Sequence, residues 1–211
     1  MTSLSNKLNQ NAAVLAAIAL PVKTFLCPSD AAANGQPRTN AADLGSTPVG
    51  QTNYKGVCGD NWAWGSFTYN PTGNSNGLDA GDGIFYRTDG VPGTGGHGPL
   101  TMAIITNGDG LANTFMIGED MPALNRWCSW PYSNNAVGTC AIPLDNAKRA
   151  GQPGFGNTSD WPDIYSFRSN HTNGANFGMG DGHVQFITDS IDLTLYRQLS
   201  TYNGGEPVSP P

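Results

Sequence analysis

The residues best suited to chemistry gather in one short stretch, residues 169–187, which holds two of the three histidines. His171 is followed after nine residues by Asp181, and His183 stands two positions later. Two histidines and a carboxylate could bind a metal ion that activates water, which is the chemistry of a metal-dependent hydrolase. His171 is the candidate catalytic residue, because it lies at the start of a predicted strand and Asn170 or Asp163 could orient its ring.

The same stretch predicts a β-hairpin, which separates these groups. Its apolar residues Ala175, Phe177 and Met179 occupy alternate positions, as in a strand with one buried face. Asp181-Gly182 is a two-residue sequence that suits a hairpin turn, so Asp181 also has a purely structural explanation. At about 3.4 Å per residue, His171 is some 40 Å of extended chain from the second histidine. We therefore do not expect the two histidines to share a site.

Outside the hairpin, the chemical patterns are weaker. His97 and Glu119 could complete a metal site with His171, but no two histidines have the spacing of a known ligand motif. The chain has no G-x-S-x-G sequence, and Ser166 and Ser169 are merely close to His171. If the protein is an enzyme, we expect a calcium- or zinc-dependent hydrolase of small esters or lactones.

Two other groups of residues have both structural and functional explanations. Glu119 and Asp120 are adjacent carboxylates whose repulsion a cation or Arg126 could relieve, and we favour the arginine. The tryptophans could form the core or a surface that stacks on sugars, which gives carbohydrate binding as a further alternative. They are Trp62, Trp64 and Trp127.

Composition limits the class of protein. The 211 residues suit one domain spanning 1–211, and 28 glycines and 15 prolines predict many turns and long loops. A net charge of −6 with no basic cluster argues against nucleic acid as a partner. The apolar run at residues 12–20 is too short to span a bilayer, and no secretory signal precedes it.

The four cysteines lack the C-x-x-C spacing of zinc and redox motifs. We expect two disulfides, Cys128–Cys140 and Cys27–Cys58, although other pairings and four reduced thiols remain open. Disulfides would place the protein in an oxidising compartment.

The element pattern predicts an α+β fold. Residues 1–20 form a helix, with its regular pattern over residues 3–19 and Ser3 as its cap. Residues 21–190 form a loop-rich antiparallel sheet, and residues 191–211 form a last helix and tail. Within the sheet we expect strands at Val22–Leu26, Asn53–Val57 and Ile84–Tyr86, a hairpin of Thr101–Thr106 with Asn113–Gly118, and the hairpin described above.

Three separated motifs carry a family resemblance. They are Val22-Lys23-Thr24-Phe25-Leu26-Cys27-Pro28-Ser29-Asp30, the run from Ile105 to Glu119 around Asn107-Gly108-Asp109-Gly110, and His171 with Asp181-Gly182 nine residues on, followed by the closing Gly204-Gly205-Glu206-Pro207. With them the chain resembles the DUF1559 proteins of planctomycetes, which have a pilin-type N-terminus. The resemblance implies a pseudopilin-like fold, with an N-terminal helix packed on an antiparallel sheet. It also implies a location outside the cytoplasm or on the cell surface, with other pilin-like subunits or cell-surface polymers as partners. The hydrophobic methylation helix of that family is missing from this sequence.

A local similarity concerns calcium. Asp163-Ile164-Tyr165-Ser166 is similar to the calcium loop of the major pseudopilins of type II secretion. Calcium takes six to eight oxygen ligands, and the resemblance implies Asp163, Ser166, Asn170 and Asp181 as metal-binding residues. The first expectation for function is therefore a calcium-stabilised, pilin-like structural or interaction domain.

Overall fold

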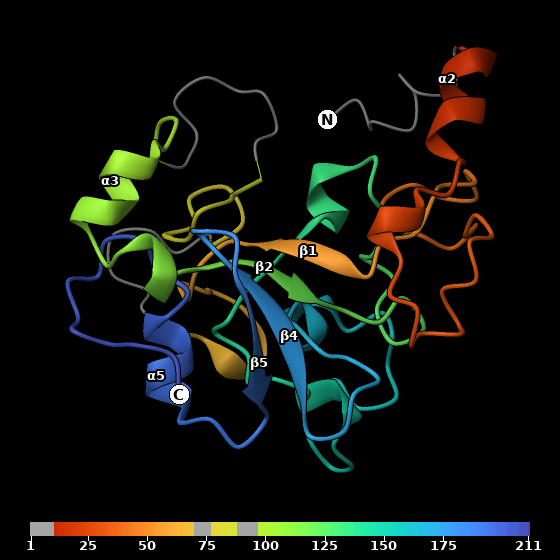
Figure 1. Cartoon of the computed structure of the whole chain (residues 1–211). Helices are drawn as coiled ribbons and strands as arrows, with labels where there is room; N and C mark the ends of the chain where they lie inside the picture. Colours follow the sequence, from red (N-terminus) through yellow and green to blue (C-terminus); the bar gives the residue numbers. More distant parts are fainter. Residues whose placement is uncertain (1–10, 70–76, 88–96) are drawn as a thin grey trace.

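A five-stranded sheet forms the centre of the molecule (Figure 1). The computed structural model describes residues 11–69, 77–87 and 97–211. The fold is α+β, but the sheet is mixed and not purely antiparallel as expected, because β1 pairs with β3 in parallel. In spatial order the strands are β3 (Val137–Gly138), β1 (Tyr54–Val57), β2 (Phe115–Glu119), β4 (Gly174–Met179) and β5 (Val184–Thr188).

The hairpin of β4 and β5 confirms the prediction from residues 169–187. Ala175 pairs with Ile187 and Gly178 with Val184 in an antiparallel register. Gly182 has a φ of +92° in the turn, a backbone conformation that favours glycine. Alternate side chains of β4 are fully buried, as period-two patterning requires.

One face of the sheet is covered by α5 (Leu193–Gln198), so the predicted final helix is confirmed in shorter form. Asp192 caps this helix by accepting hydrogen bonds from the backbone N–H groups of residues 194 and 195. Tyr196 and Leu199 are fully buried against Phe177 and Ile187. Burial of side chains of this size contributes about 1.5–3 kcal/mol each, so this face forms the main core.

The N-terminal helix differs from the expectation. Helix α2 (Ala12–Ile18) is capped by the side chain of Asn11, the residue before it, while the predicted cap Ser3 lies outside the described residues. Ile18 packs against Ala41, Leu44 and Val49 of a loop, and Figure 1 shows α2 standing away from the sheet. The described part of the predicted helix therefore packs on a loop and not on the sheet as expected.

Two predicted strands are helical. Residues 23–25 form the 3-10 turn η1 (Lys23–Phe25), and residues 102–107 form α3 (Met102–Asn107). The Thr101 side chain accepts a hydrogen bond from the Ile104 N–H at 3.3 Å, and this cap favours a helix over a strand in the short apolar run. The hairpin expected at Thr101–Gly118 is therefore wrong, although its second half is β2.

The remaining elements are short. No strand is assigned at Ile84–Tyr86, where Phe85 N donates to the Val57 carbonyl at 3.0 Å. Across the ranges described above, none of the helices combines the length and apolarity needed to cross a bilayer. The other helical turns are η2 (Gly65–Phe67), η3 (Leu111–Asn113), η4 (Ser133–Asn135), η5 (Asn146–Lys148) and α4 (Trp161–Ile164).

Candidate metal centre

Three potential metal ligands from distant parts of the sequence meet at the end of β2. His171 Nε2 lies 3.3 Å from Glu119 Oε1, and Cys27 Sγ lies 3.7 Å from the same oxygen. The three donor atoms lie within 4.8 Å of one another. Among the described residues, this is the one group of three histidine, cysteine or acidic side chains that could bind a single ion.

Glu119 is held in place by the neighbouring strand. Its Oε2 accepts hydrogen bonds from the Asn176 backbone N–H at 2.6 Å and from Asn176 Nδ2 at 3.2 Å. Both contacts use the same carboxylate oxygen. Oε1 is therefore the oxygen directed at Cys27 and His171, and it is the one available to a metal.

A buried network connects the loops that carry the other two ligands. Asn53 accepts a hydrogen bond from Cys27 N at 3.0 Å and donates one to Asp30 Oδ2 at 2.7 Å. Asn170 donates to Asp30 Oδ1 at 3.1 Å, directly before His171 in the chain. Asp30 thus fixes the loop of Cys27 and the loop of His171 relative to each other.

The spacing of the donor atoms suits zinc. Zinc binds sulfur at about 2.3 Å and imidazole nitrogen or carboxylate oxygen at about 2.0–2.2 Å, usually as a tetrahedron, so its ligand atoms lie about 3.3–3.7 Å apart. The two separations measured at Glu119 match this range. Mixed sulfur, nitrogen and oxygen donors favour zinc over calcium, which prefers oxygen alone. If zinc binds here, these three residues would hold it and would leave a fourth position for water.

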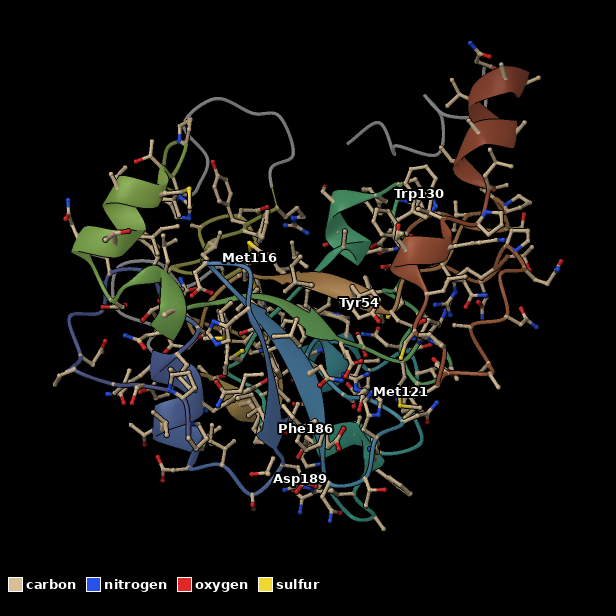
Figure 2. The ribbon with its side chains drawn as sticks, in the orientation of Figure 1. Tyr54, Met116, Met121, Trp130, Phe186 and Asp189 are labelled. Atoms are coloured by element: carbon tan, nitrogen blue, oxygen red, sulfur yellow. The ribbon has the colours of Figure 1, made fainter. Side chains whose placement is uncertain are left out.

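A groove of about 950 Å³ extends from the candidate centre over the open face of the sheet. Glu119 belongs both to the cluster and to the groove wall, so a bound ion would lie at the groove's end. The walls of the groove are largely apolar. Gly56 leaves room for the Phe85 ring, which lies 2.8 Å from the position that a Cβ of residue 56 would occupy. Tyr54, Met116 and Trp130, labelled in Figure 2, are among the lining residues.

Tyr54 links the groove to the cluster. It lines the groove and pairs with Glu119 across β1 and β2. Burial and the adjacent Cys27 raise the pKa of Tyr54 to about 12, so the phenol stays protonated at neutral pH. Tyr54 therefore supplies a hydroxyl donor beside the thiol.

The next carboxylate, Asp120, points into the core and belongs to a different cluster. Lys55 Nζ lies 3.2 Å from its Oδ2, and Arg168 Nη1 lies 3.2 Å from its Oδ1. The predicted partner Arg126 instead donates to the Asn40 carbonyl and to Ser159. The arginine prediction is wrong because strand alternation sends the two carboxylates to opposite sides.

The residues proposed as calcium ligands have separate partners. Asp163 accepts from the Ser66 N–H at 2.6 Å, Ser166 donates to the Ile142 carbonyl at 3.0 Å, and Asn170 donates to Asp30. Asp181 binds His183 in the exposed β4–β5 turn. The structure does not show these four side chains converging on one ligand set.

The remaining histidines lie away from the cluster. His183 Nδ1 lies 2.7 Å from Asp181 Oδ1, and the hairpin keeps this pair at the turn, as the strand geometry predicted. His97 contacts the Gly83 and Gly98 carbonyls through its two ring nitrogens. Of the histidines, His171 alone combines with acid and thiol groups in the described part of the chain.

The disulfide prediction requires correction, because all four cysteines are free and buried. Cys128 donates to Asp120 at 3.2 Å, and Cys27 contacts Ser29 at 3.0 Å in addition to Glu119. Burial raises the pKa of Cys58 to about 12 and also raises the pKa values of Cys128 and Cys140. Those three thiols are therefore protonated core groups.

The tryptophans belong mainly to a second core. Trp62 is fully buried and Trp127 is 8% exposed, and their indole N–H groups donate to the Pro162 carbonyl and to Asp43. Trp64 is partly buried against the same cluster. A sugar cannot stack on the two buried rings in this conformation, so these three residues do not form the expected binding surface.

Sequence reasoning found Glu119 and His171 but missed Cys27 as their partner. The sequence predicts a disulfide for Cys27 because the four cysteines lack the C-x-x-C spacing of metal and redox motifs. The signal was present in its family motif, where cysteine directly precedes Pro28-Ser29-Asp30. Only the folded chain shows that Asp30 links this motif to Asn170.

Comparison with known families supports the resemblance found in the sequence. A family model described as a protein of unknown function, DUF1559, matches residues 2–194. Comparison with curated proteins and with solved structures found no match. Because the family model covers most of the sequence, including all three candidate ligands, the chain belongs to the DUF1559 family.

Proposed function

We propose that this chain is a zinc-binding domain that holds one ion between Cys27, Glu119 and His171 and binds a small ligand in the adjacent groove. The convergence of the three donor atoms within 4.8 Å, at the end of that groove, carries the proposal. The Asn176 hydrogen bonds to Glu119 support it, because they leave the second carboxylate oxygen directed at the cluster. Such fixed outer contacts are typical of metal sites.

Metal titration tests this role. Protein purified without chelators should contain zinc, and the stripped protein should take up one equivalent in competition with a chromophoric chelator. Cobalt substitution should give a thiolate charge-transfer band and the absorption of a tetrahedral ion. His171→Ala should abolish stoichiometric binding, while His183→Ala removes a histidine of the exposed turn and should bind normally.

Two results would contradict zinc binding. Equal zinc affinity in the two histidine variants would place the ion elsewhere. A melting temperature that rises with calcium and not with zinc would favour the oxygen-ligated site expected from the pseudopilin similarity. Cys27→Ser separates thiolate ligation from packing, because it should lose the cobalt charge-transfer band while remaining folded.

Hydrolysis is the second candidate function. Three protein ligands would leave one position of a bound zinc ion for water, and the His171 side chain is one-third exposed, so solvent reaches the cluster. Zinc lowers the pKa of bound water to about 7, which provides a hydroxide nucleophile at neutral pH. The groove would hold the apolar part of a small ester or lactone with its carbonyl at the ion.

Turnover measurements test hydrolysis separately from binding. Zinc-loaded protein should hydrolyse members of an ester and lactone panel, and a chelator should abolish the reaction. His171→Ala should lose activity, and His183→Ala should retain it. Activity that survives both the chelator and His171→Ala would exclude this mechanism, whereas zinc binding without turnover would leave a binding domain.

We further propose that the domain works as a pseudopilin-like subunit outside the cytoplasm, at the cell surface. Helix α2 supports this setting because, of its seven residues, only Ile18 is buried, while Val14 is 38% exposed. A second copy of the chain could cover that apolar surface. Light scattering should show that the unaltered protein associates and that Val14→Asp reduces this association. If the unaltered protein is a monomer, assembly through α2 is contradicted. Fractionation of the source cells tests the location.

A further inference from the structure

A second pocket, distinct from the candidate zinc centre, lies between the loops of Asp60 and Asp82 and the C-terminal segment. It encloses about 630 Å³. Three carboxylates line it, namely Asp60, Asp82 and Glu206, together with the rings of Tyr69 and Tyr202. Among the residues that the structure describes, no lysine or arginine lines this pocket.

Asp60 points to a missing partner in this pocket. The residue is only 6% exposed, and its Oδ1 has no hydrogen-bond partner among the described residues. A buried carboxylate oxygen without a partner is costly, so a ligand that donates hydrogen bonds would be stabilised here. Oε2 of Glu206 is also buried without a partner in the described part of the chain.

Arg197, a basic residue that acts on Asp60, directs its hydrogen bonds away from this pocket. Arg197 donates to the Ala141 carbonyl through Nη2 at 2.7 Å and through Nε at 3.2 Å, and its guanidinium lies 3.7 Å from the Tyr69 ring centre. In the ranges that the structure describes, neither Asp60 nor Asp82 forms an ion pair with a basic side chain. Arg197 therefore offsets the charge of Asp60 only from a distance, and a ligand that brings a cation into direct contact would balance it further.

The pocket walls are fixed in position. Asp60 N donates to Asp82 Oδ1 at 3.0 Å, which joins the two acidic loops. Asp109 accepts hydrogen bonds from Gly204 N at 2.8 Å and Gly205 N at 2.7 Å, which anchors the segment leading to Glu206. A ligand would enter a site whose walls already have internal support.

We propose that this pocket binds an organic cation with primary or secondary ammonium groups, such as a polyamine. A single calcium ion fits less well, because its oxygen ligands lie within about 5 Å of one another. Among the described residues, the three carboxylates do not form a group with donor atoms within 4.8 Å. A longer cation can reach separated carboxylates and pack its carbon chain against the tyrosine rings.

The protonation of Asp60 supports the proposal independently of the pocket shape. Burial, followed by the charge of Asp82 and a side-chain hydrogen bond with it, raises the pKa of Asp60 to about 7. Glu206 raises it further and Arg197 lowers it. A bound ammonium group would favour the ionised carboxylate, so binding near pH 7 should release protons.

Calorimetry with spermidine on the full chain tests the site, with zinc present and with zinc removed. We expect saturable binding that is the same in both conditions, and a heat that varies with the ionisation enthalpy of the buffer. Asp60→Asn should weaken binding at least tenfold. Glu206→Gln, in a partly exposed residue, should weaken it severalfold and provides a second test if the first variant does not fold.

Asp181→Asn is the matched control, because it removes one negative charge at the exposed β4–β5 turn. It should bind spermidine like the unaltered protein. Equal weakening in all three variants would show diffuse attraction to an acidic protein and would overturn the proposal. Absence of saturable binding, or calcium binding that excludes spermidine from the site, would also overturn it.

Discussion

Glu119 and Asp120 are adjacent in sequence, yet they lie in opposite electrostatic environments. Asp120 is buried with two fixed cations, Lys55 and Arg168, and also accepts a hydrogen bond from Asn125 Nδ2 at 2.7 Å. Around Glu119 the described residues place a thiol, a histidine and an amide, but no lysine or arginine within ion-pair distance. The chain supplies the positive charge in one cluster and not in the other.

This difference in surrounding charge indicates that Asp120 belongs to a structural cluster and Glu119 to a candidate binding site. A buried carboxylate requires compensation, and Asp120 obtains it from side chains that are themselves buried. Glu119 is also a buried carboxylate that requires compensation, but it lies at the edge of a groove. There His171 is accessible to solvent, and an external ion can enter. Removing Asp120 should therefore affect folding, and removing Glu119 should affect ligand binding.

The largest effect should follow from Asp120→Ala. The substitution leaves Lys55 and Arg168 buried without a counter-charge, which costs about 3–5 kcal/mol in typical buried pairs. Urea unfolding should show a lower midpoint with an unchanged slope. Asp120→Asn keeps the shape and the hydrogen-bond acceptor, so its loss should be smaller. A loss below about 1 kcal/mol in the alanine variant would contradict the structural role of this cluster.

Glu119→Gln should have little effect on the metal-free protein, because the change leaves no buried lysine or arginine unpaired. Its effect should appear when zinc is added. At a free zinc concentration 100 times the Kd, the unaltered protein gains about 2.7 kcal/mol of stability, and the variant should lose most of that gain. Thermal melts with and without zinc measure this difference. Equal zinc stabilisation in both proteins would place the ion away from Glu119.

The sequence predicts individual strands of the sheet better than it predicts the side-chain clusters around Glu119 and Asp120. Alternation along β4 and the turn at Gly182 are local signals, and both are confirmed. Residues 102–107 show why local signals can fail: an apolar run compatible with a strand becomes helical once Thr101 caps it. The helix and strand patterns are ambiguous in runs this short.

The candidate zinc centre depends on contacts across the fold. Cys27 is 92 residues from Glu119 and Glu119 is 52 from His171. Sequence patterns identify each residue as reactive, but the pairing requires the Asp30 network and the β2–β4 register. The same limit explains the disulfide error, because cysteine spacing alone carries no information about the partners that a buried thiol meets.

Asp60 extends the comparison to a second carboxylate without a fixed cation. Its folded-state pKa of about 7 is above the usual value near 3.9 for an unfolded aspartate. The unfolded chain therefore loses its proton first, and folding stability falls as pH rises from about 4 through 7. Asp82, Glu206 and Arg197 are the charged groups acting on it.

Asp60→Asn should reduce this pH dependence. Compared with the unaltered protein, the variant should gain on the order of 2 kcal/mol at pH 8 relative to pH 5, since each pKa unit corresponds to about 1.4 kcal/mol. Urea unfolding at the two pH values measures the change. Parallel stability profiles for the two proteins would show that Asp60 ionises normally and that its pocket requires no compensating cation.

The smallest effect tests how Glu119 is oriented. Asn176→Ala removes the Nδ2 hydrogen bond to Glu119 Oε2 but retains the shorter one from the backbone N–H. Zinc affinity should fall about tenfold, the lower end of the range for residues that orient metal ligands. Gln185→Ala, on the neighbouring strand β5, is the control and should bind zinc normally. Unchanged affinity in Asn176→Ala would mean that the strand backbone alone positions Glu119, so that the β2–β4 register, and not the amide side chain, creates the site.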